Sequence, residues 1–171
     1  MIKGLLTSLL LFSVSATAVT SSTYIRENDT PPEDMMCLIK NIYFEARNQS
    51  LEGQIAVAQV TLNRVDDPRF PNSICSVVTQ AHTDSRGNPI RHKCQFSWYC
   101  DGKSDKMRDI KGKKNAMEVA LNVVSGVYPD LVKGATHYHT TTVFPRWRTE
   151  LTKVGVIEDH IFYRWDLRKR N

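Results

Sequence analysis

The chain has 171 residues, of which 41% are hydrophobic, 24% charged and 9% aromatic, and its formal net charge is +5. These values lie near the globular average and exclude a collagen-like, coiled-coil or intrinsically disordered chain. The interior contains no apolar run of about 18 residues, which excludes a polytopic membrane protein.

The first residues have the form of a secretory signal. Lys3 is their only charge, an apolar stretch covers residues 5–14, and Ala16-Thr17-Ala18 offers the small side chains that a signal peptidase requires. We therefore expect residues 1–18 to be a signal peptide and the protein to be exported to the periplasm or the extracellular cell wall. A buried N-terminal helix and a retained membrane anchor are the alternatives.

Periodic apolar positions predict four helices after a linker. Residues 19–33 are polar and end in Pro31-Pro32-Glu33, which indicates a linker that leads into a helix. The expected helices are residues 34–47 with Asp34 as the N-cap, residues 50–65 with a stripe that begins at Leu51, residues 73–80, and residues 113–125 followed by a capping Gly126. The polar stretch 81–93 contains Gly87-Asn88-Pro89 and is expected to be a surface loop.

After Gly134 the pattern changes from helical to extended. Residues 136–140, 151–157 and 160–165 are rich in β-branched and aromatic side chains, which favours a small antiparallel sheet. The predicted fold class is α+β, mainly α, with a helical body and a small sheet near the C-terminus. One domain is expected over residues 34–167, followed by a basic tail at 168–171.

The chain contains four cysteines, and an even number in an exported protein favours two disulfides. A zinc site is less favoured because no C-x-x-C pair is present. Cys94 and Cys100 close a short loop, which favours their pairing and leaves Cys37 with Cys75. The other two pairings stay open at this point.

The moderate positive charge suits an anionic partner. Nucleic-acid binding would need a continuous basic stripe with interleaved aromatic residues, and the basic residues are scattered instead. We therefore expect no nucleic-acid partner, no stable membrane insertion once the signal is removed, and a monomer. No phosphate-binding glycine loop or nucleophile motif is present, and no cofactor is expected.

Glu45 is the most informative acidic residue. On the first expected helix it lies within about 60° of Leu38 and Ile42, on the apolar stripe. Burial in apolar surroundings raises the pKa of a carboxyl group, which a general acid working near neutral pH requires. Glu45 is therefore a candidate catalytic acid. The alternative, which helix geometry alone favours, is that it lies at the helix end and pairs with Arg47 or another cation.

Two further segments could bind a substrate. Residues 94–100 place aromatic side chains among small polar groups, a combination that binds sugars by stacking and hydrogen bonding; a loop packed into the core is the alternative. Residues 137–139 form an H-x-H pattern on an expected strand, so both imidazoles should share a face and bind a substrate or, as a weaker alternative, a metal ion. An ordinary pair of solvated histidines is the further alternative. The candidate binding residues are Gln95, Phe96, Ser97, Trp98, His137, Tyr138 and His139.

Several blocks in order resemble the cell wall hydrolases related to the spore-cortex-lytic enzyme SleB. The blocks are Ile42-Tyr43-Phe44-Glu45-Ala46-Arg47, residues 51–60, Leu62-Asn63-Arg64-Val65, residues 70–75, Gln95-Phe96-Ser97-Trp98 and residues 134–139. The resemblance covers about residues 35–165. Tyr-Phe-Glu replaces the Tyr-Gly-Glu of spore enzymes, and the histidine-rich block is closer to Gram-negative and phage members, which argues against spore-cortex specificity.

The resemblance implies a lysozyme-like catalytic domain that cleaves peptidoglycan glycan strands, with Glu45 as the catalytic acid. Ordinary glycosidases use two carboxylates, and here only Glu45 fits such a role. The other candidates are interpreted as surface charges: Glu52, Asp101, Asp105 and Glu150. A single acid suits lytic transglycosylation, in which a 1,6-anhydro product forms. The enzyme could be a resident exported protein or a phage-encoded endolysin.

Three other functions are weighed against this prediction. One is a muramidase or glucosaminidase with a second acid. Another is a zinc-dependent murein amidase or endopeptidase built on His137 and His139. The third is a wall-binding module without catalytic activity, against which the position of Glu45 on an apolar stripe argues.

Overall fold

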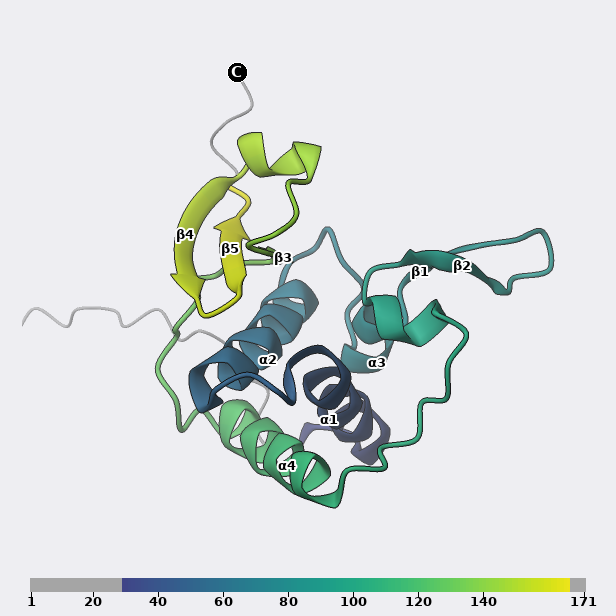
Figure 1. Cartoon of the computed structure of the whole chain (residues 1–171), viewed down its shortest axis with the longest axis horizontal. Helices are drawn as coiled ribbons and strands as arrows, with labels where there is room; N and C mark the ends of the chain where they lie inside the picture. The colour runs from purple at the N-terminus through teal and green to yellow at the C-terminus, as the bar shows by residue number, and fades with distance from the viewer. Residues whose placement is uncertain (1–28, 167–171) are drawn as a thin grey trace, which may run out of the picture.

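The computed structural model describes residues 29–166, and Figure 1 shows their arrangement. The elements in chain order are α1 (Pro32–Ala46), α2 (Leu51–Asp66), α3 (Ile74–Val78), β1 (Ala81–Thr83), β2 (Pro89–Cys94), η2 (Ser97–Cys100), α4 (Ile110–Val124), β3 (His137–Thr140), η3 (Arg146–Thr149), β4 (Thr152–Ile157) and β5 (His160–Arg164). The expected signal peptide, residues 19–28 of the expected linker and the basic tail at 168–171 lie outside the described residues. Between residues 29 and 166, no helix combines the length and apolarity that a membrane crossing needs.

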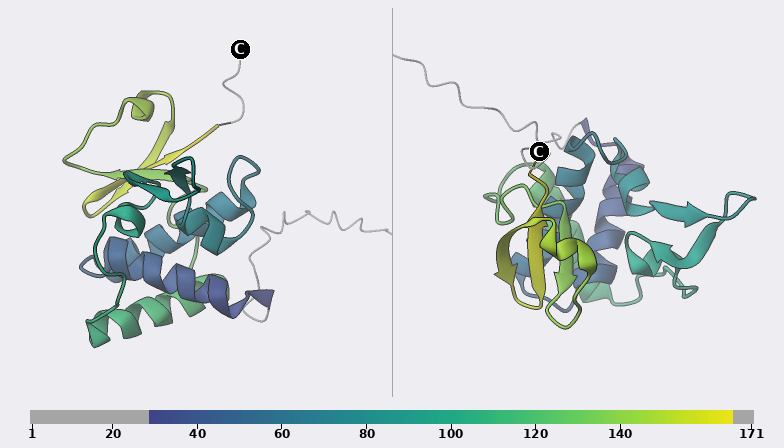
Figure 2. Two further views of the ribbon diagram at one scale, coloured as in Figure 1. Left: turned by 90° about the vertical axis from the view of Figure 1, so that its right-hand side faces the viewer. Right: turned by 90° about the horizontal axis from the view of Figure 1, so that it is seen from above.

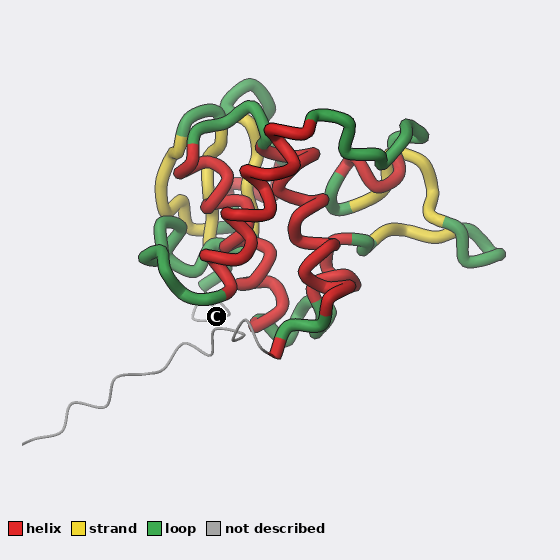
Figure 3. The backbone as a smooth tube through the Cα atoms, turned by 90° about the horizontal axis from the view of Figure 1, so that it is seen from below, coloured by secondary structure: helices red, strands yellow, loops and turns green. Residues whose placement is uncertain are grey.

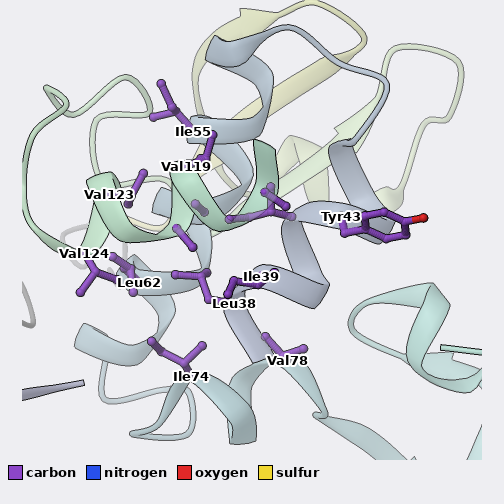
Figure 4. Packing of buried hydrophobic residues seen from close by; sticks show 14 of the residues in the cluster. Leu38, Ile39, Tyr43, Ile55, Leu62, Ile74, Val78, Val119, Val123 and Val124 are labelled. Carbon is purple, nitrogen blue, oxygen red and sulfur yellow. The ribbon is translucent and has the colours of Figure 1, made fainter. Parts of the chain in front are cut away.

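The helical body forms around one apolar core. α1 packs against α2, α3 and α4, and Figure 4 shows side chains from all four helices converging between them. Helix periodicity explains this, since residues three and four apart share a face. Leu51 departs from the expected stripe of α2 and is 49% exposed, because it lies in the first turn of the helix. Fully buried members of the core include Leu38, Ile42, Ala58, Ile74, Val77, Ala120 and Val124.

The start of α1 differs from the prediction. The helix begins at Pro32, whose fixed φ suits the first helical turn, so residues 32–33 belong to the helix rather than to a linker. Asp34 therefore does not cap its own helix. Its carboxylate accepts hydrogen bonds from the backbone N–H groups of Ile74 at 3.3 Å and Cys75 at 2.8 Å, and thereby caps α3. The other predicted helices are confirmed, although α4 begins three residues earlier than expected, at Ile110.

The predicted C-terminal sheet is also confirmed. Its strands are antiparallel in the order β3-β5-β4, and Figure 2 shows the sheet lying over one side of the helical body. A second apolar cluster attaches it there, in which Ala56 and Val60 of α2 pack with Phe162 of β5. Gly126 adopts a φ of +70° directly after the C-cap of α4, as expected for a capping glycine. The fold class is thus α+β, mainly α.

Residues 81–94 form a β-hairpin rather than the expected loop. β1 and β2 pair antiparallel, and Gly87 takes a φ of +83° in the turn. The hairpin carries no alternating apolar pattern because most of its side chains are exposed. Figure 3 shows that it projects from the side of the helical body opposite the C-terminal sheet.

Both predicted disulfides are present. Cys37 of α1 is bonded to Cys75 of α3, and Cys94 at the end of β2 is bonded to Cys100 of η2. The first crosslinks two helices of the core. The second fixes the short η2 segment against the hairpin.

Candidate active site

Glu45 lies in the last turn of α1, at the junction of the helical body and the sheet. Its side chain is half-buried, and burial raises the pKa of its carboxyl group; the hydrogen bond from Tyr138 and the charge of Arg64 oppose this in part. Arg47 does not pair with Glu45, because its guanidinium lies over the Tyr43 ring, 5.0 Å from the centroid. The carboxyl group thus has the environment of a proton donor.

Tyr138 supplies the hydrogen bond to Glu45. It lies on β3, and its hydroxyl donates to Glu45 Oε2 at 3.1 Å. Burial, followed by the neighbouring carboxyl group, raises the pKa of the phenol well above its ordinary value. The hydroxyl therefore stays protonated and keeps its donor role across the working pH range. The sheet lies against α2, so Tyr138 joins the two halves of the fold at the candidate acid.

Arg64 is the cation that faces this pair. It lies in the last turn of α2 and is 5% exposed, and its Nε donates to the carbonyl oxygen of Thr136 at 2.7 Å. Its guanidinium also lies over the rings of Phe70 and Phe96, at 5.3 and 5.0 Å. Burial lowers the pKa of Arg64, although nearby groups including Glu45 raise it. Arg64 thus holds the backbone of Thr136, two residues before Tyr138, and it stabilises the ionised form of Glu45.

His137 and His139 share one face of β3, as predicted, and that face is opposite Tyr138. Both rings contact Trp147 of η3, at centroid distances of 5.3 and 5.5 Å. His139 is buried, with Nε2 3.0 Å from Tyr163 Oη and Nδ1 2.8 Å from the Thr140 carbonyl oxygen. The side chains of these histidines therefore point away from the face of β3 on which Tyr138 contacts Glu45.

The side chain of His137 is uncharged near neutral pH. Burial, together with the positive charges of Arg64 and Arg69, lowers its pKa to about 4. Its Nδ1 lies 2.9 Å from Thr136 Oγ1. Among residues 29–166, no three His, Cys, Asp or Glu side chains are grouped closely enough to hold a metal ion.

The candidate binding residues of segment 94–100 differ in how far they are exposed. Phe96 is 1% exposed and forms part of the core beneath Arg64, so the expectation that it binds a substrate is corrected by its burial. Trp98 is 8% exposed and stacks on Phe44, with ring centroids 4.9 Å apart. Gln95 and Ser97 are exposed. Ser97 lines a cavity beside α1, whereas Gln95 lines a different one next to the hairpin.

Sequence reasoning missed two features of the site. Arg64 was not singled out, because a cation in the last turn of a helix ordinarily complements the helix dipole. Asp101 and Asp105, which are expected to be surface charges, both line the cavity beside α1 and are half-buried. The position of Arg64 within one of the resembling blocks was the available signal for the first.

Comparison with known proteins identifies the family of the chain. Residues 48–163 match the model of a family described as Cell Wall Hydrolase. The chain is 28% identical over 129 residues to the spore cortex-lytic enzyme of Bacillus subtilis and 28% identical over 130 residues to that of Halalkalibacterium halodurans. Each match covers 75% of this chain but only 37% and 34% of the relatives, so the chain spans about a third of their length.

Solved structures show the same fold. The catalytic domain of the germination-specific lytic transglycosylase SleB from Bacillus anthracis superposes with a TM-score of 0.62 and 25% identity, over 80% of this chain and 98% of that domain. The catalytic domain of the Bacillus cereus SleB protein gives a TM-score of 0.57 at 24% identity, over 79% of this chain and 95% of that one. With the family model matching residues 48–163, more than half of the sequence, the chain belongs to the cell wall hydrolase family related to SleB.

Proposed function

We propose that this protein is an exported lytic transglycosylase that cleaves the bond between N-acetylmuramic acid and N-acetylglucosamine in peptidoglycan. The observation that carries the proposal is Glu45, a half-buried carboxyl group whose pKa is raised by burial and whose Oε2 accepts a hydrogen bond from Tyr138 at 3.1 Å. Membership of the cell wall hydrolase family and the likeness to a lytic transglycosylase domain support the substrate class.

The reaction needs one group that acts first as an acid and then as a base. Glu45 donates its proton to the glycosidic oxygen as the bond from C1 of the muramic acid to that oxygen breaks. The 6-hydroxyl oxygen of the same sugar then bonds to C1, and its proton passes to the Glu45 carboxylate. The products are a 1,6-anhydro end and a free 4-hydroxyl, and the acid is regenerated.

Tyr138 and Arg64 stabilise the carboxylate that exists between these two steps. The phenol donates to it directly, while the guanidinium contributes a positive charge without an ion-pair geometry to Glu45. Both groups are held by packing, so little reorganisation is needed when the charge develops. Export is supported by the signal-like N-terminus and by the two disulfides, which persist in oxidising compartments.

The test is mass spectrometry of the muropeptides released from purified peptidoglycan by the wild-type protein and by Glu45→Gln. We expect 1,6-anhydro ends, each lighter by one water than a hydrated reducing end. Glu45→Gln should lower kcat/KM by about 10²- to 10⁴-fold, the usual contribution of general acid–base catalysis. The matched control is Glu118→Gln, an exposed carboxylate on α4, which should leave the rate unchanged.

Two results would contradict the proposal. Hydrated reducing ends would assign a muramidase-type hydrolase with a second carboxylate, for which Asp105 in the cavity beside α1 is the candidate. A Glu45→Gln protein that still clears peptidoglycan at the wild-type rate would remove Glu45 from catalysis altogether.

A further inference from the structure

A cavity of about 300 Å³ opens beside the end of α1 that carries Glu45. Two of its wall residues, Phe44 and Arg47, flank Glu45 in the sequence. The other lining residues are Trp98 and members of the segment that follows it, including Asp101, Lys103 and Asp105. The mechanism proposed above uses none of these side chains.

One wall of the cavity is apolar and rigid. Phe44 and Trp98 stack with their ring planes 24° apart, and the Trp98 indole N–H donates to Asn41 Oδ1 at 3.0 Å. Asn41 is fully buried and donates in turn to Thr61 of α2 at 3.0 Å. The stacked pair is therefore fixed to the core and presents a preformed surface beside the candidate acid.

The remaining walls carry charges of both signs. Arg47 is exposed, and its guanidinium reaches a protein acceptor only at 3.5 Å, the carbonyl oxygen of Tyr43. Lys103 and Asp101 form a loose ion pair at 3.9 Å. Asp105 is half-buried, and within residues 29–166 its carboxylate has no hydrogen-bond or ion-pair partner. The Asp105 carboxylate and the exposed Arg47 guanidinium line one cavity, and together they suit a ligand that carries both an ammonium and a carboxylate group.

We propose that this cavity binds the stem peptide attached to the muramic acid, with the ammonium group of its diamino acid at Asp105 and a peptide carboxylate at Arg47. The proposal rests on the proposed function. The stem peptide hangs from the sugar whose C1 bond is cleaved, so a peptide site must adjoin the catalytic acid. Trp98 meets that requirement, because its indole is bonded to Asn41, which lies one helical turn before Glu45 on the same side of α1. The volume is at the small end of ligand cavities and suits one diamino acid residue.

This assignment predicts a preference for glycan strands that carry peptides. The experiment compares kcat/KM on strands with diaminopimelate-containing stems and on the same strands after removal of the peptides by an amidase, with anhydro ends counted by mass spectrometry. The wild-type protein should prefer the peptide-bearing strands by about tenfold or more, as expected when a charged hydrogen bond forms on binding. Asp105→Asn and Arg47→Gln should each reduce that ratio toward one, while Glu118→Gln should preserve it.

A binding measurement separates the two charged contacts. The free tripeptide L-Ala-D-Glu-diaminopimelate is titrated into the Glu45→Gln protein by calorimetry, beside the lysine tripeptide that lacks the side-chain carboxylate. We expect the diaminopimelate peptide to bind more tightly, and Arg47→Gln to abolish the difference. Thermal unfolding of each variant establishes that it is folded.

The outcomes distinguish this proposal from the function on which it rests. Equal cleavage of both strand types by the wild-type protein would overturn the peptide site and leave the transglycosylase assignment intact. Cleavage of neither strand type would overturn the transglycosylase assignment itself. Loss of activity on both strand types in Asp105→Asn, together with hydrated reducing ends from the wild type, would make Asp105 a second catalytic carboxylate and overturn the peptide site.

Discussion

At the scale of single residues, opposing effects act on Glu45. Burial favours the protonated carboxyl group, whereas the hydroxyl of Tyr138 and the charge of Arg64 favour the carboxylate. Burial is the largest of the three, so the pKa of Glu45 is raised on balance. An acid of this kind holds its proton at higher pH than a solvated glutamate and still yields a stabilised carboxylate once the proton is transferred.

The hydrogen bond from Tyr138 can be tested by its effect on pH dependence. The reaction requires protonated Glu45, so kcat/KM should fall as the pH rises through the pKa of that group. Tyr138→Phe removes an interaction that lowers this pKa, and the descending limb should therefore move to higher pH. The maximal kcat/KM should also drop, roughly tenfold, because the carboxylate loses a charged hydrogen bond.

The control for this variant is Tyr128→Phe, whose hydroxyl accepts from Asn122 far from Glu45 in the sequence. Its pH profile should match that of the wild type. A descending limb that stays in place in Tyr138→Phe would mean that the Tyr138 hydroxyl does not influence the acid in solution.

At the scale of elements, the site depends on helix ends that are held by their neighbours. α3 has five residues. Its backbone N–H groups are capped by the side chain of Ser73, which directly precedes the helix, and by the carboxylate of Asp34 of α1. A helix this short is not stable by itself, so its position rests on the cap, the Cys37–Cys75 disulfide and the core.

Asp34→Ala should lower the free energy of unfolding by about 1–2 kcal/mol, the usual cost of removing a helix-capping side chain. The measurement is urea denaturation followed by circular dichroism. Glu33→Ala is the matched control, because Glu33 is an exposed acidic residue in the same first turn, and its effect should be within about 0.5 kcal/mol. An equal loss in the two variants would show that the charge in the first turn matters rather than the bridge to α3.

The elements also show how far a sequence can be interpreted. The helices were predictable because each buries one face and therefore repeats apolar residues with a period of 3.6. The C-terminal strands were predictable because they are rich in β-branched and aromatic residues. The hairpin at 81–94 was not, since its side chains are mostly exposed and its pairing depends on backbone hydrogen bonds. Glu45 was singled out by its helical stripe and assigned as the acid by the family resemblance. Its contact with Tyr138 joins positions 93 residues apart and leaves no local pattern.

At the scale of the whole molecule, the candidate site lies where the helical body meets the sheet. The body supplies Glu45 and Arg64 and the sheet supplies Tyr138. The two halves are joined by the apolar cluster around Phe162 and by hydrogen bonds from α2 to the segment before β3, including Arg64 to Thr136. Both disulfides lie within the helical body and the adjoining η2 segment, and neither bonds the body to the sheet.

The disulfides should therefore govern stability more than catalysis, and to different degrees. Cys37 and Cys75 are separated by 38 positions, whereas Cys94 and Cys100 are separated by 6. Chain-entropy arguments give a loss of about 4 kcal/mol in the free energy of unfolding for the double variant Cys37→Ser/Cys75→Ser, and about 2 kcal/mol for Cys94→Ser/Cys100→Ser. Urea denaturation of the oxidised proteins measures both.

At urea concentrations too low to unfold it, Cys37→Ser/Cys75→Ser should keep the anhydro product and a near wild-type kcat/KM, because neither disulfide holds the Glu45–Tyr138 contact. A larger loss of stability from the shorter loop would contradict the entropic account, and a change of product would mean that the crosslinked body positions the acid after all.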